Sequence, residues 1–331
     1  GVLLPQHWNV GGASLPPHSE VFTDLPDEVV LATACSDCSV YLWEAQAEKC
    51  LDTLAVHQEP VLSCAFSPLG TLLGTASEDG TAKLWSVSNP AATTTLKGHT
   101  DWVNSLCWAR ATGERLVATA SMDSTAKIWD APHETCLTTL EGRVNPLLSV
   151  DCSSDGVSVL VSGAPTAMDA QLFDVRTGQM IRVLEGSNRF GHEDNVLSAV
   201  FSPDGMTVLT GGQDKVAMLW DVGTGKRIEV LEGHTGAVSA VAWSPDGRHL
   251  ATASRDRSWK LWKVGSPTEC RSTSHGHSGL LTSIAFAPNG RSVATASRDG
   301  SMRLWRVATA RHITTFSGHR SKVNCVHFLP F

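Results

Sequence analysis

The chain has 331 residues, of which 42% are hydrophobic and 18% are charged. This composition is sufficient for a hydrophobic core and excludes a chain that is disordered over most of its length. The formal net charge of −7 argues against a general binder of nucleic-acid backbones. No run of about 18 apolar residues is present, so we expect no membrane-spanning helix.

The nine cysteines are odd in number and share no common spacing. Most lie in apolar segments, which favours a reducing compartment over a disulfide framework. We therefore expect a cytoplasmic protein, with nuclear, cytoskeletal or ciliary assemblies as open alternatives. The sequence begins with Gly1 and has no basic-then-apolar leader, so we expect no signal peptide and interpret the chain as a fragment or a processed form.

Residues 1–24 contain Pro5, Pro16 and Pro17 and predict an N-terminal tail, whereas residues 25–331 predict one repeat domain. A large aromatic residue recurs in this domain every 42 to 47 residues, which indicates a repeat array. Seven residues occupy the column, and the repeats are numbered one to seven in their order: Trp43, Trp85, Trp129, Phe173, Trp220, Trp262 and Trp305.

An aspartate lies six residues before each tryptophan of the column, and a histidine lies 22 or 24 residues before five of these aspartates. A strand-like segment such as residues 250–254 precedes the aspartate. Ser-Pro-Asp-Gly at residues 202–205 and 244–247 has the composition of a tight turn, because proline fixes φ and glycine accepts a positive φ. Each repeat therefore predicts short strands joined by turns.

Gly233-His234 with Leu261-Trp262, and Gly318-His319 near the C-terminus, carry the pattern most plainly. With these motifs, residues 25–330 resemble the WD40 family. The resemblance implies an all-β, seven-bladed β-propeller in which each blade is a four-stranded antiparallel sheet. It also implies that a histidine, a serine or threonine of the second strand, the aspartate and the tryptophan hydrogen-bond within a blade. The residues of this structural network would be Asp37, Trp43, His57, Asp79, Trp85, His99, Asp123, Trp129, His192, Asp214, Trp220, His234, Asp256, Trp262, His277, Asp299, Trp305 and His319.

In blade six the hydroxyl of this network would come from Thr252 or Ser254. A catalytic triad is the functional alternative for such a His-Ser/Thr-Asp set. Its recurrence in blade after blade favours a structural role, because an enzyme does not need a copy of its triad in every repeat.

Blade one lacks an upstream histidine, and two segments could supply its missing inner strand. The C-terminal segment carries His319, Val323, Val326 and Phe328 in the columns of a first strand. Residues 18–24 are the competitor, but they place Ser19 and Asp24 in apolar columns. We therefore predict that the C-terminal strand completes blade one and closes the ring, which removes an open sheet edge.

Blade four is the divergent blade. Arg143, Ala167 and Phe173 occupy its histidine, aspartate and tryptophan columns, so we expect apolar packing to replace the polar network. Residues 187–190 form a small insertion, interpreted either as a tolerated loop or as a binding feature.

In WD40 proteins, peptides bind at the loop face near the channel, to the residue before each turn aspartate and the third residue after each histidine. By that resemblance, Arg255, Arg298 and Lys322 would form a cationic arc over blades six, seven and one, suited to a carboxylate or phosphate. Trp102 and Met122 of blade three would form an apolar anchor. The full set of candidate partner-binding residues is Arg255, Arg298, Lys322, Trp102, Met122, Glu78, Asn195 and Gln213.

No motif requires a cofactor or a metal. Cys35-Ser-Asp-Cys38 has no second pair of ligands, and His249 and the other histidines outside the column are scattered. We therefore expect a non-enzymatic scaffold that binds other proteins or peptide segments, either alone or within a large assembly, with no membrane and no nucleic-acid partner. The alternative is a targeting domain cut from a larger multidomain protein or enzyme, such as a ubiquitin-ligase substrate receptor. Phe173-Asp174-Val175-Arg176 matches a motif of such receptors imperfectly.

Overall fold

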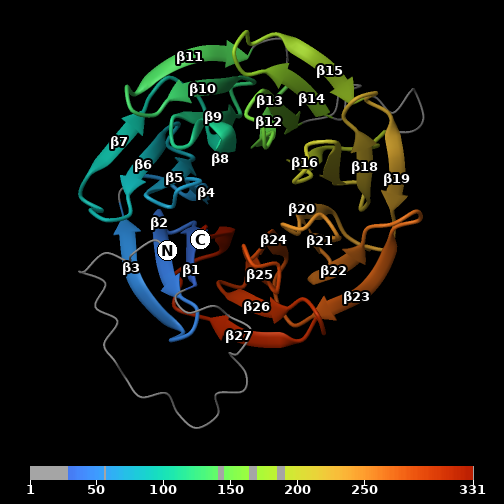
Figure 1. The fold of residues 1–331 in the computed structure, drawn as a ribbon. Helices are drawn as coiled ribbons and strands as arrows, with labels where there is room; N and C mark the ends of the chain where they lie inside the picture. The colour runs from blue at the N-terminus through green and yellow to red at the C-terminus, as the bar shows by residue number, and fades with distance from the viewer. Residues whose placement is uncertain (1–28, 56, 141–144, 164–169, 185–190, 331) are drawn as a thin grey trace.

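The computed structural model describes residues 29–55, 57–140, 145–163, 170–184 and 191–330. These residues form 28 strands and one short 3-10 helix, η2 (Arg110–Thr112). The strands make seven four-stranded antiparallel sheets that stand as blades around a ring (Figure 1). The prediction of an all-β, seven-bladed propeller is confirmed.

Each blade runs from an inner strand beside the central channel to an outer strand on the rim. Blade one contains β28 (Val323–Phe328), β1 (Val30–Cys35), β2 (Ser39–Glu44) and β3 (Lys49–Ala55). Blade two contains β4 (Val61–Phe66), β5 (Leu72–Ser77), β6 (Ala82–Ser86) and β7 (Thr93–Leu96). Blade three contains β8 (Val103–Trp108), β9 (Leu116–Ser121), β10 (Ala126–Asp130) and β11 (Thr135–Leu140).

The other four blades repeat this order. Blade four contains β12 (Leu147–Cys152), β13 (Ser158–Gly163), β14 (Ala170–Asp174) and β15 (Met180–Leu184). Blade five contains β16 (Val196–Phe201), β17 (Thr207–Gly212), β18 (Ala217–Asp221) and β19 (Arg227–Leu231). Blade six contains β20 (Val238–Trp243), β21 (His249–Ser254), β22 (Ser258–Lys263) and β23 (Glu269–His275), and blade seven contains β24 (Leu281–Phe286), β25 (Ser292–Ser297), β26 (Met302–Arg306) and β27 (His312–Phe316).

The C-terminal strand closes the ring, as the sequence predicts. β28 pairs antiparallel with β1, with Leu31 opposite Phe328 and Thr33 opposite Val326. Figure 1 shows β1 and the C-terminal end of the chain side by side near the channel. The competing segment, residues 18–24, and the predicted tail, residues 1–24, lie outside the described residues.

The hydrophobic core is divided among the seven junctions between blades. Each buried apolar cluster draws its residues from two adjacent blades. Trp85, Trp129 and Trp220 are among the largest side chains that are fully buried in this way. Burying a large apolar side chain contributes about 1.5–3 kcal/mol, so the junctions supply most of the driving force for folding.

Side chains of the inner strands also connect neighbouring blades by hydrogen bonds. At the second position of an inner strand, Asn324 donates to the carbonyl of Val61 at 2.7 Å, and Asn104 donates to that of Leu147 at 2.7 Å. Ser239 and Thr282 make the equivalent bonds at the next junctions, to Leu281 and Val323. These contacts fix each blade against the next beside the channel.

In blade four, Phe173 is the one residue of the three network columns that the structure describes, and it makes the apolar contacts that the sequence predicts. Phe173 is buried and belongs to the apolar cluster between blades three and four. Its neighbour Asp174 ends β14 and accepts backbone hydrogen bonds from the turn that follows. Arg143, Ala167 and the insertion at residues 187–190 lie outside the described residues.

Candidate functional site

The upper face of the propeller is the end where the turn after the second strand of each blade meets the loop that enters the same blade. In blade six the network residues lie just beneath this face. Nδ1 of His234 is 2.8 Å from Oδ2 of Asp256, and Nε2 of His234 is 2.8 Å from Oγ1 of Thr252. The indole N–H of Trp262 donates to the same Thr252 oxygen at 3.0 Å.

The proton positions follow from this arrangement. A carboxylate only accepts, so Nδ1 of His234 carries the proton and Nε2 accepts from the Thr252 hydroxyl. The Thr252 oxygen then accepts from Trp262, and each polar group of this network has a partner. Ser254 has a different role, because it accepts from the amide of Asp256 at 3.0 Å and donates to the carbonyl of Gly236.

Burial and hydrogen bonding shift the pKa values of this network in a consistent way. Burial lowers the pKa of His234 and outweighs the opposing effect of Asp256, so the imidazole is neutral. Burial alone would raise the pKa of Asp256. Hydrogen bonds from Ser258, His234 and backbone amides outweigh that effect and lower it to about 2.

The same network recurs in blades two, three, five and seven. Its hydroxyl comes from Thr75, Thr119, Thr210 and Thr295, each of which bonds both the histidine and the tryptophan of its blade. All four of these threonines are fully buried. A buried hydroxyl that already serves an imidazole and an indole cannot reach a substrate, so the set holds the blade together and is not a catalytic triad.

Blade one differs from the prediction. Thr33 bonds both His319 and Trp43, as in the other blades, but Nδ1 of His319 faces the carbonyl oxygen of Gly300 at 3.2 Å and makes no bond to Asp37. Asp37 instead accepts from the hydroxyl of Tyr41. The physical reason is that the Tyr41 ring packs against the His319 imidazole, with 4.8 Å between the ring centroids, and the Tyr41 hydroxyl occupies Oδ2 of Asp37.

The backbone positions the predicted upper-face residues in pairs. In six blades, the amide before the turn aspartate donates to the carbonyl of the third residue after the histidine. The six donor–acceptor pairs, at 2.8–3.0 Å, are Ser36–Lys322, Glu78–Pro60, Met122–Trp102, Gln213–Asn195, Arg255–Ala237 and Arg298–Leu280. These backbone bonds join the two predicted sets of upper-face residues in six blades.

Side-chain exposure differs among the members of this ring. Arg255, Arg298 and Gln213 are exposed, whereas Lys322, Met122, Glu78 and Asn195 are partly buried. Trp102 is 45% exposed, which is high for a tryptophan. Asn195 donates to Gln213 at 3.3 Å, so these two amides are held against each other.

Charge is divided across the upper face. Blades six, seven and one carry Arg255, Arg298 and Lys322, and two exposed arginines that sequence reasoning missed, Arg257 and Arg320, add to them. Arg257 directly follows Asp256, and Arg320 directly follows His319. The sequence would have revealed both if the residues next to the network aspartates and histidines had been compared. The loops of the other blades carry one exposed cation, Lys215 of blade five, and mostly carboxylates on this face: Glu59, Glu78, Asp101, Glu193 and Asp194.

The described residues contain no group of three or more histidine, cysteine or acidic side chains placed to hold a metal ion. Within the same residues, no helix has the length and hydropathy needed to cross a bilayer.

The fold and the repeated network agree with the comparison with known families. The model of the WD domain, G-beta repeat, matches residues 48–86, 91–130, 179–221, 225–263 and 268–306. The chain belongs to the WD40 family. WD40 propellers are generally non-catalytic scaffolds for other proteins.

Three relatives illustrate the range of this family. The chain is 30% identical over 196 residues to Nuclear distribution protein PAC1 of Coccidioides posadasii, covering 57% of this chain and 41% of that protein. It is 27% identical over 239 residues to Pre-mRNA-processing factor 19 of Bos taurus, covering 72% and 38%. It is 24% identical over 217 residues to a guanine nucleotide-binding protein subunit beta of Oryza sativa, covering 62% and 56%. The chain thus spans roughly two fifths to just over half of the length of these relatives.

Proposed function

We propose that the chain is a non-enzymatic scaffold that binds a segment of another protein on its upper face. The observation that carries the proposal is the divided charge of that face, with five cations over blades six, seven and one and the exposed Trp102 on blade three. A partner segment with an acidic or phosphorylated part and a large apolar side chain is complementary to this pattern. We also propose a cytoplasmic location, which agrees with the nine free cysteines.

The backbone bonds of the upper face support a mechanism of rigid presentation. The amides of Arg255 and Arg298 are fixed to the neighbouring loop, and the aspartate that follows each is fixed by the network. Little backbone entropy remains to be lost when a partner docks. Arginine adds specificity, because its planar guanidinium pairs with a carboxylate or phosphate through two hydrogen bonds.

Affinity capture from native lysate with mass spectrometry tests the proposal. Wild type is compared with Arg255→Glu/Arg298→Glu and with Trp102→Ala. Lys226→Glu/Arg248→Glu is the matched control, because it makes the same charge change at exposed turns of the opposite face. A stoichiometric partner that both upper-face variants lose and the control retains supports the proposal, whereas equal capture by all four proteins removes it.

A second function follows from the lengths of the relatives. Because the matches cover only 38% to 56% of Pre-mRNA-processing factor 19, PAC1 and the plant beta subunit, the propeller can serve as the targeting domain of a longer protein. The complete reading frame separates this function from that of an independent scaffold. A further folded domain in that frame would favour targeting.

A further inference from the structure

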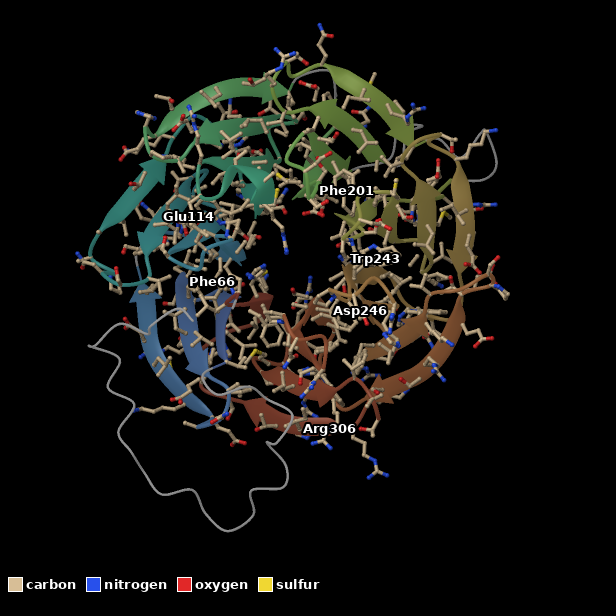
Figure 2. All side chains as sticks on the ribbon, in the orientation of Figure 1. Phe66, Glu114, Phe201, Trp243, Asp246 and Arg306 are labelled. Carbon is tan, nitrogen blue, oxygen red and sulfur yellow. The ribbon has the colours of Figure 1, made fainter. Side chains whose placement is uncertain are left out.

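A groove of about 580 Å³ lies between blades six and seven, away from the upper face. Blade six contributes His249 at the start of β21 and Arg271 and Ser272 from β23. Blade seven contributes Arg291 and Arg306, at the ends of turns on the lower side. Figure 2 shows Arg306 toward the rim of the ring, whereas Trp243 and Asp246 lie nearer its centre.

The lining of this groove is basic. Four of its residues are histidine or arginine, and none is acidic. Asp246 is the carboxylate that interacts with His249, and it is already held by the Ser244 hydroxyl at 2.6 Å and the Arg248 amide at 3.0 Å. Three guanidinium groups in one groove of an acidic protein favour a ligand with several negative charges.

Arg271 differs in residue type from the residues at the equivalent position of the other blades. In six blades the outer strand has a bulge opposite the tryptophan column, and the extra residue stands at the rim. The other five blades with this bulge place Leu51, Leu137, Ile181, Ile228 and Ile313 there. Packing does not explain an arginine at a position that is aliphatic in the other five blades. The substitution therefore indicates a role for its charge.

Arg306 also carries a positive charge at a position where most other blades do not. It follows the tryptophan of blade seven, where four other blades carry the carboxylates Glu44, Asp130, Asp174 and Asp221. Asp130 shows what that position does elsewhere, because it pairs with Arg115 at 3.1 Å within its own blade. The charge is thus reversed at the junction where Arg271 also appears.

The corresponding groove between blades two and three provides an internal comparison. It has about 420 Å³ and is lined by equivalent positions, including Leu72 in the place of His249. Its charged residue is Glu114, which the Ser67 and Thr71 hydroxyls bind. The fold therefore produces a groove at both junctions, and only the sequence of blades six and seven makes one of them cationic.

The wall of the cationic groove also contains an unused hydrogen-bonding group. Oγ of Ser272 is shielded from solvent and has no partner among the described residues. A buried hydroxyl without a partner destabilises a fold, because it loses its hydrogen bonds to water. If the Ser272 side chain rotates toward the groove, a ligand oxygen can accept its hydrogen bond and remove this penalty.

We propose that the groove between blades six and seven binds the phosphate monoesters of a multiply phosphorylated small molecule, either soluble or as a lipid head group. Arg271, Arg291 and Arg306 supply bidentate donors to phosphate oxygens, and His249 and Ser272 add single donors. This site is independent of the upper face and does not rest on the scaffold function.

Isothermal titration calorimetry with inositol hexakisphosphate at 0.15 M salt tests the site. We expect saturable binding by wild type and at least about tenfold weaker binding by Arg271→Leu/Arg306→Asp. These substitutions restore residue types that other blades carry, so the double variant should fold. Arg291→Glu at an exposed position repeats the test independently. Lys226→Glu, at an exposed turn of blade five, is the control and should bind like wild type. Arg255→Glu/Arg298→Glu shows whether the upper face takes the probe instead.

Vesicles of phosphatidylcholine with and without phosphatidylinositol 4,5-bisphosphate separate the two sources of phosphate. Binding of the soluble probe alone supports a free ligand, and binding to the phosphoinositide vesicles that the groove variants lose supports a head group. No binding of either probe by wild type overturns the proposal. Binding that the groove variants retain, or that the upper-face variant loses instead, overturns it as well.

Discussion

The hydroxyl of Tyr41 donates a hydrogen bond of 2.6 Å to Oδ2 of Asp37. Tyr41 is the one tyrosine of the chain and stands where no other blade has a phenol. It replaces the histidine–aspartate bond that blades two, three, five, six and seven contain, at the junction where the two ends of the ring meet. Burial alone would raise the pKa of Asp37, but this bond and those from Cys35 and two backbone amides lower it.

Tyr41→Phe should destabilise the protein by about 1–2 kcal/mol, because it removes the donor to Asp37 and keeps the ring that packs on Trp43. Urea denaturation followed by tryptophan fluorescence measures the change. A free energy of unfolding equal to that of wild type would show that the Tyr41 bond contributes nothing to ring closure.

Asp256→Ala should destabilise the protein by about 3 kcal/mol. Three donors lose their acceptor: the buried side chains of His234 and Ser258, and the backbone amide of Thr235. Asp246→Ala is a suitable comparison, because Asp246 lies in an exposed turn of the same blade. Equal losses for the two variants would argue against a special role of the network.

Stability should fall as the pH drops from about 6.5 toward 4. Burial lowers the pKa of His319 and His327 to about 4, so the unfolded chain binds more protons than the folded chain in this range. The stabilisation is fully present above pH 6.5 and is lost on acidification. One such group changes the free energy of unfolding by up to about 1.4 kcal/mol per pH unit.

His327→Ala should make this pH dependence shallower, and alanine is the residue at the same inner-strand position in blades two, six and seven. Unfolding curves at pH 7.5, 6.0 and 5.0 measure the slope, with the value at pH 7.5 reporting any loss of packing. An unchanged slope would assign the effect to the other histidines.

Asn324→Ala should cost about 1–2 kcal/mol, because Asn324 donates to the carbonyl of Val61 across the junction of blades one and two and to the Ser36 hydroxyl within blade one. Asn89→Ala, at an exposed position in a turn, should cost less than about 0.5 kcal/mol. The two variants are compared by their midpoints in urea.

Deletion of residues 318–331 should abolish cooperative thermal unfolding, because it removes β28 and exposes the edge of β1 and two apolar clusters. Val323→Asp places a charge at a fully buried position of β28 and tests the same strand without truncation. A melting temperature close to that of wild type in both proteins would mean that another segment closes the ring.

The sequence alone determined the repeat, the number of blades and the strand that closes the ring. These features depend on spacing along the chain: the tryptophan and aspartate columns recur at a nearly fixed period, and Val323, Val326 and Phe328 fill the apolar columns of an inner strand. Thr252 and Ser254 share one face of β21, so sequence could not choose between them. Only the positions of the imidazole and indole in space assign Thr252 to the network.

The tertiary structure alone decided which residues of different blades meet. His319 comes from the far end of the chain, and its imidazole packs against the Tyr41 ring and faces the carbonyl of Gly300 in blade seven. Arg271 and Arg306 are 35 residues apart and become neighbours only because the turns of blade seven pack against the outer strand of blade six. Local patterns specify each blade, whereas a surface shared by two blades is set by how their side chains pack together.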